Sequence, residues 1–230
     1  MKDLLNKYCK FFDIVRTEHE KRGMASGHDF DHAVSVANLA AIFCESLELK
    51  EFAWVAGLCH NADRIIAIDR QTPRRDIAKE DVAVLVREWL KSTDLLLSVP
   101  RIVEAVQEHG EPNNPNDDKI IVALKDADRV VNARLDVVIR SGQFRSNLPV
   151  FDPILLLNDT RGKYNSRLTI VADLMDCLDW GNLEDARFGV RTAGAKKMIV
   201  ERVALLKQFL EMIVEQRREE GLVPYPILSE

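Results

Sequence analysis

Apolar residues recur at helical spacing along most of this chain. Leu4, Phe11 and Val15 lie one or two helical turns apart. This spacing predicts an amphipathic helix over residues 1–24. The same pattern predicts further helices at residues 31–47, 50–62, about 77–92, about 99–109, about 119–140, about 167–179 and about 192–219. Alternation with a period of two is absent over any useful length, so the pattern predicts an all-α fold, a single-domain helical bundle.

Polar segments rich in proline, asparagine or glycine separate several of these helices. They predict loops at residues 69–76 and 111–118 and irregular structure at 141–153. Leu135 and Ile139 share the expected buried face of the helix that ends near residue 140. We take residues 1–230 as one domain with a core at about 25–140. A C-terminal helical part, about residues 150–220, would pack on that core.

Four polar residues fall on the apolar stripes of four different helices. At about 100° per residue, Val36 and Leu39 lie within about 40° of His32, which therefore shares their buried face. The other three residues are His60, His109 and Asp128. A buried imidazole or carboxylate needs a partner, because its desolvation is costly. Together these groups suit a first-row divalent metal, which lowers the pKa of a bound water.

Composition narrows the classes of partner. The net charge of −5 argues against a non-specific nucleic-acid binder, which usually carries a basic surplus. No apolar run approaches about 18 residues, so no membrane span is expected. The first residues lack the apolar core of a signal peptide, and the four cysteines are widely spaced. We therefore expect reduced thiols and a cytoplasmic protein.

The segments around the four polar positions carry a family resemblance. They are Gly27–His32, Ala56–His60, Ile102–His109, Lys125–Arg129 and Thr192–Lys197. As a set they resemble the motifs of the HD superfamily of metal-dependent phosphohydrolases, in its small single-domain subgroup. The likeness covers about residues 25–215 and implies a helical bundle of HD-domain type.

One position departs from the family pattern. The superfamily is named for a His-Asp pair, whereas here His60 is followed by Asn61. Asparagine keeps one carbonyl oxygen but lacks the negative charge, so the affinity for a hard cation should fall and a bridged two-metal site is not expected. Three alternatives stay open. Asn61 ligates a metal through its amide oxygen, Asp63 substitutes for it, or the site holds no metal and is not catalytic.

The resemblance implies a hydrolase of a phosphomonoester or phosphodiester, with a nucleotide as the expected substrate. The implied metal ligands are His32, His60, Asn61 and Asp128, and the metal would be Mn²⁺, Mg²⁺, Fe²⁺, Co²⁺, Ni²⁺ or Zn²⁺. The residues expected to contact substrate or transfer protons are His28, Asp29, His109 and Arg129, and for His109 the alternative is a further metal ligand. For Asp29 the alternative is helix capping, for His28 plain surface exposure, and for Arg129 a surface ion pair.

Asn61 also favours a second hypothesis. A degenerate HD domain would bind a nucleotide or a protein partner without turning it over. The joint presence of His32, His60, His109 and Asp128 opposes that interpretation, since packing alone would then have to explain them. The sequence leaves open the substrate, the metal and the oligomeric state.

Overall fold

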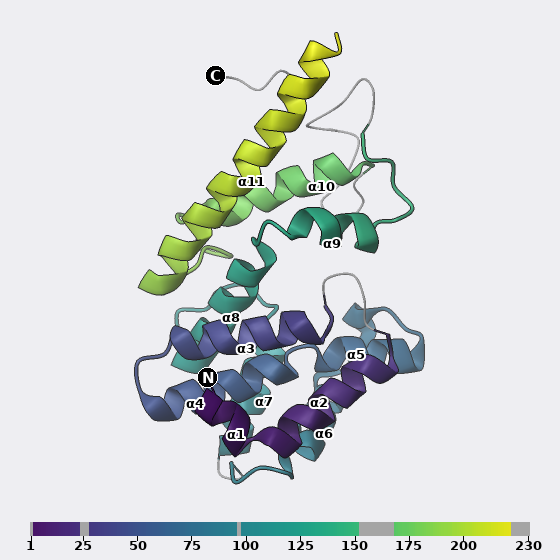
Figure 1. Cartoon of the computed structure of the whole chain (residues 1–230). Helices are drawn as coiled ribbons and strands as arrows, with labels where there is room; N and C mark the ends of the chain where they lie inside the picture. Colours follow the sequence, from purple (N-terminus) through teal and green to yellow (C-terminus); the bar gives the residue numbers. More distant parts are fainter. Residues whose placement is uncertain (1, 24–27, 96–97, 152–167, 222–230) are drawn as a thin grey trace.

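The computed structural model describes residues 2–23, 28–95, 98–151 and 168–221, and within them it contains helices and no strand (Figure 1). The predicted all-α fold is therefore confirmed. The α-helices are α1 Lys2–Lys7, α2 Cys9–Lys21, α3 Phe30–Ile42, α4 Leu47–Cys59, α5 Ala62–Arg70, α6 Lys79–Leu90, α7 Val99–Glu108, α8 Lys119–Asn132, α9 Val137–Phe144, α10 Ile170–Asp176 and α11 Ala193–Glu219. Two 3-10 helices are η1 Arg74–Asp76 and η3 Cys177–Gly181. None of these helices is both long and apolar enough to cross a membrane.

The larger hydrophobic core lies among α1 to α8, and its largest fully buried side chains include Phe11, Trp54 and Leu124. Helices α3 and α4 approach each other closely in this core. A Cβ atom on Gly57 would lie 2.4 Å from the Cα of Ala37. Only glycine allows this contact, because a Cβ atom would collide with the α3 backbone. The contact brings the beginning of α3 close to the end of α4.

The chain between α4 and η1 differs from the sequence prediction. The expected helix at 50–62 ends at Cys59, and α5 then runs from Ala62 to Arg70 into the predicted loop. The carbonyl of Asn61 accepts the first hydrogen bond of α5, from the N–H of Ile65 at 3.1 Å. His60 and Asn61 therefore lie in a tight turn between two helices rather than on a continuous helical face.

The helix predicted at about 119–140 is wrong in its second half. The structure ends α8 at Asn132 and begins α9 at Val137, so Leu135 and Ile139 are 46% and 67% exposed rather than buried. Polar contacts hold the turn between them. Arg134 donates to Asp136 at 2.5 Å and to the hydroxyl of Ser35 on α3 at 2.8 Å. These contacts favour a turn where apolar spacing alone would continue the helix.

Helices α9, α10 and α11 lie together on one side of the α1–α8 bundle (Figure 1). Buried residues such as Val137, Leu174 and Leu210 join these three helices in a second apolar cluster. A third cluster, with Val130 and Ile199, joins α8 to α11. The domain limits stated above stay a prediction, and residues 152–167 of the expected C-terminal part lie outside the described residues.

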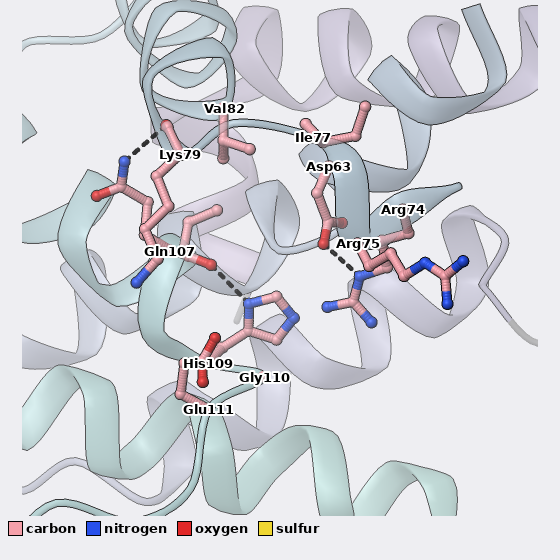
Figure 2. Close-up of a pocket in the computed structure, with 11 residues that line it drawn as sticks. Asp63, Arg74, Arg75, Ile77, Lys79, Val82, Gln107, His109, Gly110 and Glu111 are labelled. Carbon is pink, nitrogen blue, oxygen red and sulfur yellow. Dashed lines mark hydrogen bonds and ion pairs between the residues drawn. The ribbon is translucent and has the colours of Figure 1, made fainter. Parts of the chain in front are cut away.

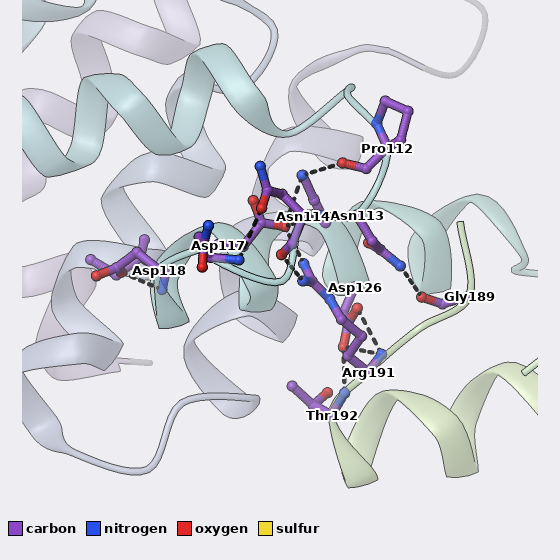
Figure 3. A network of polar contacts seen from close by, with 12 residues as sticks. Pro112, Asn113, Asn114, Asp117, Asp118, Asp126, Gly189, Arg191 and Thr192 are labelled. Carbon is purple, nitrogen blue, oxygen red and sulfur yellow. Dashed lines mark hydrogen bonds and ion pairs between the residues drawn. The ribbon is translucent and has the colours of Figure 1, made fainter. Parts of the chain in front are cut away.

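A buried polar network anchors the start of α11 to α8 (Figure 3). Lys125 is 1% exposed and donates to the carbonyl of Pro112 at 2.8 Å and to Asp117 at 2.9 Å. The buried carboxylate of Asp126 accepts from the backbone N–H of Arg191 at 2.9 Å and of Thr192 at 2.7 Å. Since Thr192 is the N-cap of α11, Asp126 supplies the negative charge that a helix N-terminus favours.

Candidate metal centre

Three polar side chains from three elements converge in the α1–α8 bundle. His32 comes from the first turn of α3, His60 from the turn after α4, and Asp128 from the middle of α8. Oδ1 of Asp128 lies 3.2 Å from Nε2 of His32 and 4.0 Å from Nε2 of His60. One ligand atom from each residue falls within 4.8 Å of the others. The structure thus brings together three of the residues that the sequence placed on buried helix stripes, and their role as metal ligands stays a prediction.

Local hydrogen bonds fix the tautomers of two site histidines. His60 is the C-cap of α4, and its Nδ1–H donates to the carbonyl of Gly57 at 2.6 Å. His109 is the C-cap of α7, and its Nδ1–H donates to the carbonyl of Val106 at 2.6 Å. Each bond satisfies a carbonyl at a helix end and leaves a lone pair on Nε2.

Electrostatics keep His60, His109 and Asp128 in the protonation states that bind cations. Burial lowers the pKa of His60 well below its ordinary value and also lowers the pKa of His109. Burial alone would raise the pKa of Asp128, but its hydrogen bond with His32 and the nearby rings of His60 and His109 bring it well below the usual range. Neutral imidazoles beside a carboxylate are the protonation states that metal binding requires.

The imidazoles form a row through the site. Ring centroids are 5.2 Å apart for His28 and His32, 5.1 Å for His32 and His60, and 5.4 Å for His60 and His109. Burial lowers the pKa of His28 to about 2, so this ring is neutral as well. His28 and His109 therefore flank the His32, His60 and Asp128 cluster on opposite sides.

Asn61 lies beside this row, and its amide is held at one end. Its Nδ2 donates to the carbonyl of His28 at 3.2 Å and contacts Nε2 of His19 at 3.4 Å. Its Oδ1 is buried and has no hydrogen-bond partner among the described residues. Sequence reasoning missed His19, although its place one turn after Val15, on the apolar face of the first predicted helix, was a usable signal.

These donors fit a divalent cation. Nε2 of His60, like Oδ1 of Asn61, is buried without a hydrogen-bond partner in the described part of the chain. An unpaired buried acceptor is costly, and a metal ion would satisfy both atoms. Imidazole and oxygen ligands together suit first-row divalent ions.

Comparison with known proteins agrees with this geometry. The family model described as HD domain matches residues 29–133. This stretch is an HD domain. The match runs from the residue before α3 to the residue after α8, and it contains His32, His60 and Asp128. Neither the curated proteins nor the solved structures contain a significant match to the chain.

Asp63 lies outside the metal cluster of the HD domain. Its Oδ1 accepts from the N–H of Arg64 at 2.7 Å, and its Oδ2 is paired with Nε of Arg74. Figure 2 shows this pair on one wall of a cavity of about 400 Å³, with the ring of His109 beside it. Both oxygens of Asp63 are engaged, so this carboxylate is a poorer substitute ligand than the sequence alone suggested.

A second cavity, of about 380 Å³, lies on the His28 side of the HD domain. Its lining includes Arg64, Phe144 and Trp180, and Arg74 contributes to both cavities. Burial lowers the pKa of Arg64 to about 10, and the described residues offer its guanidinium no hydrogen-bond partner in the structure. The positive charge of Arg64 lies near Asp128 and forms no ion pair among the described residues.

The remaining expected residues have contacts of their own. Asp29 is the N-cap of α3 and accepts from the N–H of His32 at 3.0 Å, which orients the first turn that carries His32. Arg129 donates to Oδ1 of Asn113 at 2.8 Å and to the carbonyl of Gly189 at 3.3 Å. The structure therefore directs Arg129 toward two loops instead of the His32 cluster, and its contact with a phosphate stays a prediction.

Proposed function

We propose that the protein is a metal-dependent phosphohydrolase that acts on a phosphomonoester or phosphodiester. The observation that carries the proposal is the convergence of His32, His60 and Asp128 within 4.8 Å in an HD domain. HD domains in general belong to metal-dependent hydrolases, which agrees with this chemistry.

His32, His60 and Asp128 would hold the cation, with the amide oxygen of Asn61 as a fourth ligand. A bound cation supplies Lewis-acid chemistry, which activates a water nucleophile and offsets charge on phosphoryl oxygens. Two imidazoles and only one carboxylate favour Mn²⁺, Fe²⁺, Co²⁺, Ni²⁺ or Zn²⁺ over Mg²⁺, because Mg²⁺ prefers oxygen ligands.

The groups beside the cluster would bind the substrate and move protons. Arg64 offers an available positive charge for a phosphate oxygen. His28 and His109 are neutral rings on either side of the cluster, and the fixed Nδ1–H of His109 leaves Nε2 to accept a proton. Asp29 supports the site by capping the helix that carries His32.

A nucleotide is the substrate that the second cavity suits best. Phe144 and Trp180 offer aromatic surface to a base, and Arg64 lies in the same lining. The net charge of −5 and the local character of this cationic site agree with a small phosphorylated ligand rather than a nucleic acid. We also propose a cytoplasmic location, because the four cysteines are widely spaced and all of them are free thiols in the structure.

The test is a panel of nucleotides and simple phosphate esters, assayed with each divalent metal and with a chelator. We expect metal-dependent release of phosphate or nucleoside, and its loss by at least about 100-fold in Asp128→Asn, because a ligand charge is removed. Asp94→Asn, which changes an exposed carboxylate away from the cluster, is the matched control. Equal activity in Asp128→Asn and wild type would overturn the proposal.

Asn61 favours a second function, that of a binding module. Its neutral amide reduces the negative charge available to a cation. A binding module would bind a nucleotide at equilibrium with the same affinity in the presence of a chelator, and it would release no product with any metal. Calorimetric titration of the chelator-treated protein with a non-hydrolysable nucleotide analogue distinguishes the two functions.

A further inference from the structure

Asn61 is the position at which this HD domain departs from its family pattern, and its surroundings contain a second unusual residue. His19, on α2, is 2% exposed and lies against the amide of Asn61. The Nδ1–H of His19 donates to the carbonyl of Val15 at 2.8 Å. That bond consumes the single proton of a neutral imidazole, so Nε2 of His19 can only accept.

Two acceptors thus face the same end of the Asn61 side chain. One is Nε2 of His19 at 3.4 Å, and the other is the backbone carbonyl of His28 at 3.2 Å. An amide NH₂ group has two protons and satisfies both. The opposite orientation would place the amide oxygen against two acceptors, so these contacts select one orientation.

This orientation determines where the amide oxygen lies. Nδ2 is directed toward α2 and the residue that precedes the N-cap of α3, and Oδ1 lies on the other arm of the amide. Oδ1 is buried and has no partner among the described residues. Asn61 follows His60 directly in the chain. Nε2 of His60 and Nδ1 of His32 are also buried without a hydrogen-bond partner among the described residues.

We propose that His19 is the positioning residue for Asn61: with the carbonyl of His28 it holds the amide nitrogen, so that the amide oxygen faces the cation held by His32, His60 and Asp128. The site is then built for asparagine rather than damaged by the loss of aspartate. This inference rests on the proposed function, because it requires that a cation binds.

The same contacts explain why aspartate does not fit here. A carboxylate at position 61 would direct an oxygen at Nε2 of His19 and at the carbonyl of His28, and both are acceptors. Unfavourable contacts between acceptors would replace two hydrogen bonds in a buried site, where unpaired polar groups are costly. Asn61→Asp would therefore destabilise the metal-free protein, and a residue at position 19 that can donate would relieve the effect.

The first experiment is a thermal double-mutant cycle on the chelator-treated full chain. It uses Asn61→Asp, His19→Gln and the double variant, because a glutamine amide can turn to accept or donate. We expect Asn61→Asp alone to lower the midpoint temperature of unfolding by about 4–8 °C. In the His19→Gln background, the decrease that Asn61→Asp causes should be smaller by at least about 2 °C. Equal shifts in both backgrounds would overturn the pairing of His19 with Asn61.

The second experiment is calorimetric titration with Mn²⁺ and with Ni²⁺. We expect His19→Phe, which removes the acceptor, to weaken cation binding by about 10–100-fold, and His19→Gln to weaken it less. Val15→Ala is the matched control, because it removes packing on the same face of α2 and leaves the amide contacts intact. Wild-type affinity in His19→Phe would overturn the inference. Failure of the wild type to bind any cation would instead overturn the proposed function.

Discussion

At the residue scale, the protonation of the site depends on where each imidazole sits in its helix. His60 and His109 are both C-caps, and both donate Nδ1–H to the carbonyl three residues earlier. Burial lowers the pKa of both side chains. The helix ends thus present two neutral Nε2 acceptors to the centre before any ligand arrives.

This burial predicts how stability depends on pH. In the unfolded chain, histidines take up protons as the pH falls through about 6.5, whereas His28, His60 and His109 resist protonation in the folded chain. The unfolded state then binds more protons, so the free energy of unfolding should fall below pH 6.5, by up to about 1.4 kcal/mol per pH unit for each histidine.

Urea unfolding of the chelator-treated protein between pH 7.5 and 5 measures this slope. The variant His109→Gln should have a shallower slope, since one of the buried rings is gone. A free energy of unfolding that is constant over this range would contradict the neutral state of His28, His60 and His109 in the folded chain.

Residue patterns on single helices predicted part of the site. His32 and Asp128 each share an apolar stripe of a helix, and the structure brings both together with His60. His19 was not predicted, because its partner Asn61 lies 42 residues away and in a turn. The sequence also did not predict where the Arg129 side chain points, because its hydrogen-bond partners, Asn113 and Gly189, lie in loops.

At the element scale, the contact between α3 and α4 determines the distance between His32 and His60. Gly57 permits that contact, and its carbonyl also accepts from His60. Helical spacing predicted both helices, but it placed the end of α3 five residues too late and both ends of α4 three residues too late. It did not predict the turn at His60 and Asn61 or the break after Asn132, since both depend on polar contacts that have no periodicity.

We expect Gly57→Ala to impair the site through this contact. A Cβ at 2.4 Å from the Cα of Ala37 requires α3 and α4 to move apart, which should cost about 1–3 kcal/mol of unfolding free energy and weaken cation binding. The control is Gly142→Ala in α9, where a Cβ meets nothing within 4 Å. That substitution should be neutral or stabilising by up to about 1 kcal/mol. Wild-type stability in Gly57→Ala would contradict the close approach.

At the scale of the whole molecule, the buried network of Lys125 and Asp126 joins α11 to the HD domain. Asp126 accepts from the N–H groups of Arg191 and Thr192, and the cavity beside His28 includes residues from both parts of the chain, such as Arg64 and Trp180. Trp180 also packs against the third apolar cluster, which contains Ile199 of α11, so the position of α11 affects one wall of the proposed substrate cavity.

We expect Asp126→Ala to loosen this junction. It leaves the two part-buried N–H groups of Arg191 and Thr192 without this acceptor, at a cost of about 3 kcal/mol. Hydrogen exchange should become faster in α11 before it does so in α3 and α4. Lys196→Ala, an exposed change in the first turn of α11, is the control. Unchanged exchange in Asp126→Ala would show that apolar packing alone holds α11.

The most direct test of the account is the metal content of the purified protein, measured by elemental analysis alongside His32→Ala and Asp128→Ala. The account predicts about one divalent ion per wild-type chain, lost in both variants, because each removes a ligand of a single cation. A wild-type chain that holds no metal, even after incubation with excess Mn²⁺ or Ni²⁺, would contradict the hydrolase and leave the binding module as the better explanation.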